Sequence, residues 1–296
     1  MLRRWVALAV CACSVFLSAR SEAGVRVVAT IYPLADIVQQ IGDGAVDVVT
    51  LLPPGASPHT FEPTPAQMHE VAEARLFVRV GAGLDTWTEK LLAARSPSLT
   101  VLTLTDGIAL LRLADAHADD AAAAGGGDPH IWLDPIVVRD RIVPAINDAL
   151  TQAAPQQRQV FETRATALRE ALTQLDADIR AALGPLPHRT YIGFHSAWRY
   201  FGERYGLQEI AVVEAFPGKE PSARHIATVV EQARAAQVHA ILIEPQMNPR
   251  VAEQIARDCG ARTAVVDELG APNLPGRDHY LDLMRYNSRM FAEALQ

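Results

Sequence analysis

The stretch Val25–Leu52, VRVVATIYPLADIVQQIGDGAVDVVTLL, has the pattern of a strand, a helix and a second strand. Its two ends, VRVVATI and VDVVTLL, are β-branched runs that favour strands. Between them, PLADIVQQIG has apolar residues at helical spacing and ends on Gly42. A helix between two strands returns the chain across the sheet, so the strands run parallel. The stretch therefore predicts a mostly parallel α/β sheet.

The same alternation continues along the rest of the chain, on both sides of one long helical region. The first half adds strands at 75–81 and 99–104, with helices at 65–74 and 85–94. The second half has strands at 189–194, 209–213, 239–244 and 262–267, and helices at 196–206, 223–237, 249–260 and about 279–295. Between the halves, Pro155–Leu183 fits a helix of about eight turns. Its apolar positions are Val160, Leu168, Leu172, Leu175, Ile179 and Leu183. We therefore predict two α/β lobes joined by a long backbone helix.

These patterns divide the chain into four predicted parts. They are a signal peptide over 1–23, an N-terminal α/β lobe over 24–145, a linking helical region over 146–184 and a C-terminal α/β lobe over 185–296. Residues 114–127, ADAHADDAAAAGGG, have low complexity, and we expect a mobile loop there. His117 in this loop has two interpretations, a weak recruiter of metal or part of a plain spacer.

The N-terminus has the features of a secretory signal. Arg3 and Arg4 precede an apolar run, Trp5–Leu17, that is too short to span a bilayer, and small residues flank Glu22 before a predicted cut after Ala23. Two alternatives are a membrane anchor and a lipoprotein attached through Cys13. We expect a periplasmic protein.

The charge of the chain argues against nucleic acid as a partner. The formal net charge is -7, and segment 1–23 carries three arginines and one glutamate, so its removal leaves about -9. An acidic chain without a basic patch repels nucleic acid.

Three histidines and one aspartate stand out by their settings. His59 and His195 each follow a predicted strand, Asp267 ends one, and His130 lies in DPHIWLDP between two Asp-Pro pairs. Open α/β sheets bind ligands beyond the carboxyl ends of their strands. Three imidazoles and a carboxylate form a four-ligand set suited to zinc. Spacing alone leaves open the alternative of four unrelated polar loop residues.

Sequence motifs give no support for an enzyme. HExxH, paired CxxC and a phosphate-binding glycine loop are absent, and GFHSAW lacks the G-x-S-x-G pattern of serine hydrolases. We therefore expect no catalytic residues.

Around these residues the sequence resembles the zinc/manganese solute-binding proteins of ABC importers, the ZnuA/TroA-like family. The motifs that carry the resemblance are VVATIYPLADIVQQIG, LLPPGASPHTFEPTPAQM, DPHIWLDP, GFHSAWRYFGERYGL, EPSARHIATVVEQARAAQV and IEPQMNPRVAEQIARDCGARTAVVDELG. They extend from about Val25 to the C-terminus. The joint occurrence of the three histidine motifs is specific, whereas each one alone is weak.

The resemblance implies one metal in the cleft between two lobes, held by His59, His130, His195 and Asp267. Glu268 is adjacent to Asp267, which makes that fourth position the least defined. Asp128, Asp134 and Glu62 are candidates for supporting the ligands. Related manganese binders offer a second carboxylate where this chain has His195, so Zn²⁺ is favoured over Mn²⁺ or Fe²⁺. The implied partners are an inner-membrane ABC permease with its cytoplasmic ATPase, and we expect a monomer.

Two features depart from the zinc members of that family. The tract before the second histidine has a single histidine, which does not support a metal-scavenging loop, and Cys259 alone cannot form the disulfide often found in the second lobe. The rival hypotheses are a secreted zinc hydrolase and an adhesin. The hydrolase requires an open metal position for water, which four protein ligands would fill.

Overall fold

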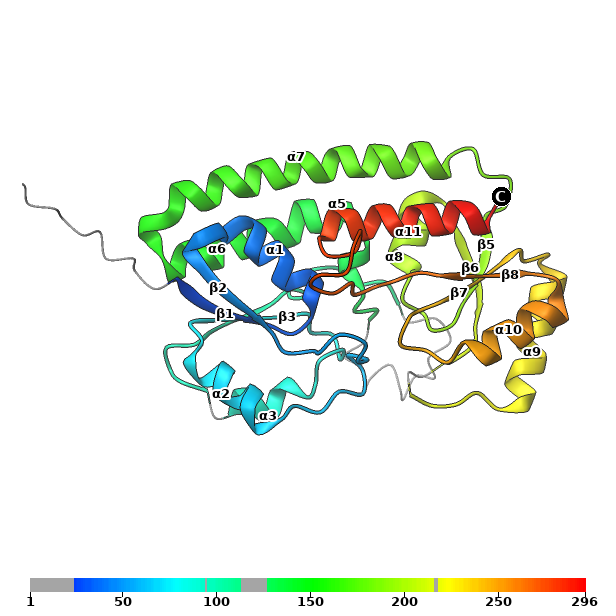
Figure 1. Ribbon diagram of the computed structural model, residues 1–296, viewed down its shortest axis with the longest axis horizontal. Helices are drawn as coiled ribbons and strands as arrows, with labels where there is room; N and C mark the ends of the chain where they lie inside the picture. The colour runs from blue at the N-terminus through cyan, green and yellow to red at the C-terminus, as the bar shows by residue number, and fades with distance from the viewer. Residues whose placement is uncertain (1–23, 94, 113–126, 216–217) are drawn as a thin grey trace, which may run out of the picture.

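The computed structural model describes residues 24–93, 95–112, 127–215 and 218–296. The predicted signal peptide, Cys13 and His117 lie outside these ranges. The described chain forms two four-stranded sheets, each parallel throughout and flanked by helices (Figure 1). The predicted two-lobed α/β fold is confirmed.

The first sheet contains β1 (Val25–Ala29), β2 (Val46–Thr50), β3 (Leu76–Arg79) and β4 (Thr100–Thr103) in the order β2-β1-β3-β4. The second contains β5 (Thr190–Gly193), β6 (Gln208–Val212), β7 (Ala240–Ile243) and β8 (Arg262–Val265) in the order β6-β5-β7-β8. The two lobes thus share one strand order. Each sheet gathers the carboxyl ends of its strands at one edge, where loops can present side chains.

The helices of the first lobe begin largely where their sequences predict. They are α1 (Tyr32–Gly42), α2 (Pro65–Glu73) and α3 (Thr88–Ala93). Thr64 and Gln67 form a capping box at the start of α2. By contrast, α3 starts three residues later than predicted, because the Asp85 carboxylate accepts the backbone N–H groups of Val80 and Gly81 and holds a turn.

Several helices lead from the end of the predicted first lobe through the predicted linking region. A short 3-10 turn (Ile131–Leu133), α5 (Pro135–Val137) and a π-helical turn (Val138–Ile142) lead into α6 (Val143–Ala153). Another 3-10 turn (Pro155–Gln157) then leads into α7 (Arg158–Leu183). Val160, counted in the predicted apolar face of the long helix, is exposed, and Phe161 is buried in its place.

The second lobe carries α8 (Arg199–Tyr205), α9 (Ala223–Ala235), α10 (Pro249–Cys259) and α11 (Tyr280–Ala294). Ser222 and Asn248 cap α9 and α10 with their side chains. Helix α7 runs along both lobes and contacts α1, α6 and α11 (Figure 1). One continuous cluster of buried side chains includes Ile31 of the first lobe and Phe291 of the second. Within the described ranges, every helix is too short or too polar to cross a bilayer.

Candidate metal centre

The structure brings the three predicted histidines together. The ring centroids of His59, His130 and His195 lie 5.3, 5.4 and 5.6 Å apart, and one nitrogen of each lies within 4.8 Å of the others. The Nε2 atoms of His59 and His130 are 3.3 Å apart. Among the described residues, these histidines form the group of His, Cys, Asp and Glu side chains that can hold a metal ion.

His59 comes from the loop that follows β2. Trp87 donates its indole N–H to the carbonyl of Pro58 over 3.0 Å, which fixes the backbone directly before the histidine. The ring of Trp87 also packs edge-on against Phe61, with centroids 4.9 Å apart. His59 is only half-buried, so it forms the more accessible side of the cluster.

His130 is held by the Asp-Pro segment that contains it. The Oδ1 atom of Asp128 lies 2.8 Å from His130 Nδ1 and also accepts the His130 backbone N–H over 3.0 Å. Asp128 is fully buried and His130 nearly so. A carboxylate behind Nδ1 leaves Nε2 free to face a metal, an arrangement common at metal-binding histidines.

His195 lies two residues beyond β5 between two buried glutamates. Its Nδ1 is 3.2 Å from Oε2 of Glu244, and its Nε2 is 3.3 Å from Oε2 of Glu268. The sequence analysis assigned no role to Glu244, although it is the last residue of the predicted strand 239–244. That position at a strand end is the signal that could have identified it.

The two acidic residues after β8 have different surroundings. The Oε2 atom of Glu268 faces the cluster, 3.3 Å from His195 Nε2 and 3.9 Å from His130 Nε2. The Asp267 carboxylate instead accepts the backbone N–H groups of Leu269 and Gly270 and pairs with Arg277 over 3.0 Å. Asp267 thus stabilises its own loop, whereas Glu268 lies beside the histidines.

The other predicted supporting residues also differ in role. Of the two carboxylates in DPHIWLDP, Asp128 contacts a cluster histidine, whereas Asp134 caps α5 and pairs through both of its oxygens with Arg204. Glu62 is exposed, and the interactions found among the described residues do not link it to the cluster.

The electrostatics of the cluster are strongly asymmetric. Burial, together with the neighbouring His130 and His195, lowers the pKa of His59 well below 6.5. Burial alone would also lower the pKa of His195, but Glu244 and Glu268 outweigh it and raise that pKa well above 6.5. Burial opposes ionisation of Glu268, yet the histidines, His195 above all, hold its pKa below 4.5. A cation is therefore favoured between these groups.

The distances suit tetrahedral coordination of a small cation. Zinc–nitrogen bonds of about 2.0–2.1 Å at tetrahedral angles separate two ligand atoms by about 3.3 Å. The His59–His130 contact and the His195–Glu268 contact both have this separation. Because the donors are mostly imidazole nitrogens, the set suits zinc and other late transition metals better than magnesium or calcium.

A cleft beside the cluster is lined by residues of both lobes. It has a volume of about 370 Å³ and is lined by Ser57 and Thr60 of the first lobe and by Phe194, Glu214 and Gln246 of the second, among others. Ser57 and Thr60 flank His59 in the chain, and Phe194 directly precedes His195. Burial raises the pKa of Glu214.

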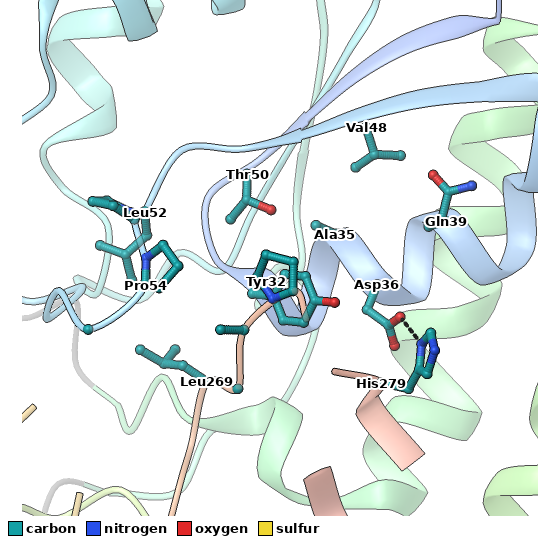
Figure 2. A pocket seen from close by; sticks show the side chains of 15 residues that line it. Tyr32, Ala35, Asp36, Gln39, Val48, Thr50, Leu52, Pro54, Leu269 and His279 are labelled. Atoms are coloured by element: carbon teal, nitrogen blue, oxygen red, sulfur yellow. Dashed lines mark hydrogen bonds and ion pairs between the residues drawn. The ribbon is translucent and has the colours of Figure 1, made fainter. Parts of the chain in front are cut away.

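A separate cavity of about 450 Å³ lies where α1 meets the segment around Leu269 (Figure 2). Asp36 and His279 pair across it, with His279 Nδ1 3.0 Å from Asp36 Oδ1 (Figure 2). The backbone N–H of Tyr280 also donates to Asp36, over 2.7 Å. None of the three cluster histidines lines this cavity, which residues of both lobes border.

Comparison with known proteins gives one consistent family. A family model described as "Zinc-uptake complex component A periplasmic" matches residues 27–294. The chain is 28% identical over 285 residues to zinc-binding protein AdcA of Streptococcus pyogenes serotype M3, an alignment that covers 90% of this chain and 55% of that protein. The chain thus spans about half the length of AdcA.

Two further similarities extend over nearly the whole of the matched proteins. High-affinity zinc uptake system protein ZnuA of Yersinia pestis is 26% identical over 295 residues, covering 93% of this chain and 92% of that one. A crystal structure of ZnuA superposes with a TM-score of 0.81 at 29% identity, covering 92% of this chain and 100% of that chain.

Proposed function

The chain belongs to the family of periplasmic component A proteins of zinc-uptake complexes, and from this we propose that it captures Zn²⁺ outside the cytoplasm and delivers it to an ABC importer. The observation that carries the proposal is the three-histidine cluster with imidazole nitrogens within 4.8 Å of one another. The relatives named for zinc binding and zinc uptake support the same cargo.

The proposed ligands are His59, His130, His195 and one carboxylate. For that carboxylate we favour Glu268 over the predicted Asp267, because Glu268 Oε2 lies 3.3 Å from His195 Nε2 whereas Asp267 is engaged by Arg277. Three neutral imidazoles and a carboxylate would replace the water shell of the ion. Binding then weakens as the imidazoles become protonated at acid pH.

The alternative cargo within the same family is Mn²⁺ or Fe²⁺. A site with three imidazoles favours Zn²⁺ over both, because affinity rises along the divalent series toward copper and zinc and manganese prefers oxygen ligands. The secreted zinc hydrolase is the rival from another class. It requires a metal position open to water, and in the proposed ligand set Glu268 would fill that position.

The proposed partners are an inner-membrane permease and its ATPase, which would receive the ion from a monomeric binding protein. A cut after Ala23 would release the protein into the periplasm, with anchoring through Cys13 as the alternative.

The two lobes share buried side chains across α7 and α11, so we expect local ordering on metal binding rather than wide hinge closure.

Metal titration of the mature, metal-free protein tests this function. We expect Zn²⁺ to bind far more tightly than Mn²⁺ in chelator-competition assays. His130→Ala and Glu268→Ala should each weaken zinc binding by more than the roughly 10- to 100-fold lost when a supporting partner is removed. Asp267→Asn should mainly lower thermal stability, because it disturbs the loop that Arg277 and Leu269 help to hold.

The exposed Glu253→Gln on α10 serves as the control and should bind zinc normally. Zinc affinity in the micromolar range or weaker, unchanged by His130→Ala, would contradict the proposed function. A selective loss in Asp267→Asn with Glu268→Ala unaffected would restore Asp267 as the ligand. Zinc-dependent hydrolysis of ester or peptide panels would favour the rival.

A further inference from the structure

We propose that Glu244 is a positioning residue for metal capture: oriented by Trp198, it fixes the His195 ring in the tautomer that presents Nε2 to the ion. The inference rests on the proposed function, since it concerns how His195 acts as a ligand. It adds a residue that lies outside the three-histidine cluster and had no role assigned from the sequence.

The two oxygens of Glu244 have different neighbours. The Oε1 atom accepts the indole N–H of Trp198 over 3.0 Å, and the Oε2 atom lies 3.2 Å from His195 Nδ1. The second contact is a close approach of a carboxylate oxygen to a ring nitrogen rather than an aligned hydrogen bond, since neither atom has a hydrogen-bond partner among the described groups. The side chains of Glu244 and His195 are almost wholly buried, so water does not compete at this contact.

Trp198 determines which oxygen of Glu244 faces the histidine. Its side chain is fully buried, and the indole N–H is a donor only, so it requires an acceptor in the interior. Glu244 Oε1 is that acceptor. The Oε2 atom is thereby left toward His195, where an acceptor beside Nδ1 favours the proton on that nitrogen. In the neutral ring, Nε2 then carries the lone pair that a metal needs.

His130 provides an internal comparison. Its supporting residue, Asp128, accepts the His130 backbone N–H and the ring nitrogen with the same atom, Oδ1. An amide in place of Asp128 can keep its oxygen in that position and serve both donors. The amide nitrogen would then replace Oδ2, which has no hydrogen-bond partner among the described groups.

Replacement of Glu244 by an amide should have a different result. In Glu244→Gln, the indole N–H of Trp198 donates to the amide oxygen. The amide N–H groups then face His195 Nδ1, which must act as an acceptor. The ring proton then moves to Nε2, where Glu268 can accept it, and the metal-facing lone pair is lost. We expect zinc affinity to fall by about 10- to 100-fold, the usual range for a supporting partner of a ligand. Asp128→Asn should lose clearly less.

The experiment compares Glu244→Gln, Asp128→Asn, Trp198→Phe and the Glu244→Gln/Trp198→Phe double variant by chelator competition with Zn²⁺. Glu253→Gln is the baseline. Without the indole N–H, the amide can rotate its oxygen toward His195, so the double variant should bind zinc more tightly than Glu244→Gln. Long-range ¹H–¹⁵N correlation spectra of the histidines report the tautomer of His195 directly, which a purely structural role of Glu244 would leave unchanged.

A loss in Glu244→Gln no larger than that in Asp128→Asn would overturn the proposal, as would an unchanged His195 tautomer. This comparison does not depend on Trp198→Phe, which removes a buried indole and can destabilise the fold. His195→Ala separates the two levels of inference. If it leaves zinc binding intact, the proposed ligand set fails. If it abolishes binding while Glu244→Gln does not, only the role of Glu244 fails.

Discussion

Trp132 donates its indole N–H to the backbone carbonyl of Glu268 over 2.8 Å, deep in the contact between the lobes. The two residues come from segments that each bring a side chain to the cluster, since His130 lies two positions before Trp132. Tyr280 adds a second link by donating its hydroxyl to the carbonyl of Trp132 over 2.7 Å. The segment DPHIWLDP is therefore bound to the second lobe through both the side chain and the backbone of Trp132. We infer that these bonds keep His130 and Glu268 at a fixed separation.

Replacement of Trp132 by phenylalanine should weaken both the fold and the site. The variant leaves the buried carbonyl of Glu268 without its donor, which costs about 1–3 kcal/mol in free energy of unfolding. Because Glu268 is then less fixed, we also expect about a tenfold loss of zinc affinity, as for other supporting contacts. Chemical denaturation and chelator competition measure the two effects.

Tyr286→Phe is the control for this prediction. It removes an exposed hydroxyl that donates to the carbonyl of Val265 over 3.1 Å, so stability and zinc affinity should both change little. Full zinc affinity in Trp132→Phe, despite a measurable loss of stability, would show that this bond does not position Glu268.

Much of the fold and the three histidines of the site could be predicted from the sequence. The β-branched runs and the capping residues locate strands and helices, and the histidine motifs identify three side chains that do meet. The orientation after β8 could not be predicted, because neighbouring residues at a strand end point in different directions. There the choice depends on Arg277, ten positions further on, which pairs with Asp267 and leaves Glu268 toward the histidines.

Long-range contacts explain the other differences. The DTWTEKLLAA pattern is helical throughout, yet α3 starts only at Thr88 because Asp85 bonds back to Val80 and Gly81. Glu244 was missed because its role depends on Trp198 and His195, which lie more than forty residues earlier in the chain. Local pattern carries no information on such pairs.

The Asp36–His279 pair should contribute to stability on the acid side of neutrality. The hydrogen bond to Asp36 raises the pKa of His279 above 6.5, and Asp278 and Asp282 act in the same direction. A histidine with a raised pKa in the folded state stabilises fully below its unfolded pKa, and the contribution is lost as pH rises through the folded pKa. His279→Gln should therefore lower the free energy of unfolding at pH 5.5 and have little effect at pH 8.5.

The His279 side chain is 61% exposed, so solvent screening keeps this effect small. Urea unfolding of the metal-free protein at both pH values measures it. His69→Gln on α2, which removes an exposed imidazole 3.3 Å from Glu73, is the control for the loss of a surface imidazole. An equal loss of stability at pH 5.5 and 8.5 in His279→Gln would contradict the predicted protonation effect.

Glu209 on β6 should have the opposite effect, because it destabilises the folded protein at high pH. Burial raises the pKa of this carboxyl from 4.5 to about 7, although Ser196 donates a hydrogen bond to its Oε1 over 2.7 Å. Between these two values the folded state holds a proton that the unfolded state has lost, so stability falls as pH rises, and above about pH 7 the cost is complete. Glu209→Gln, which is neutral at every pH, should match the unaltered protein at pH 4.5 and exceed it at pH 8 by up to about 3 kcal/mol. Denaturant unfolding at the two pH values measures this difference, with the exposed Glu231→Gln on α9 as the control. A gain of the same size at both pH values would mean that the glutamine packs better, and that the carboxyl does not titrate as predicted.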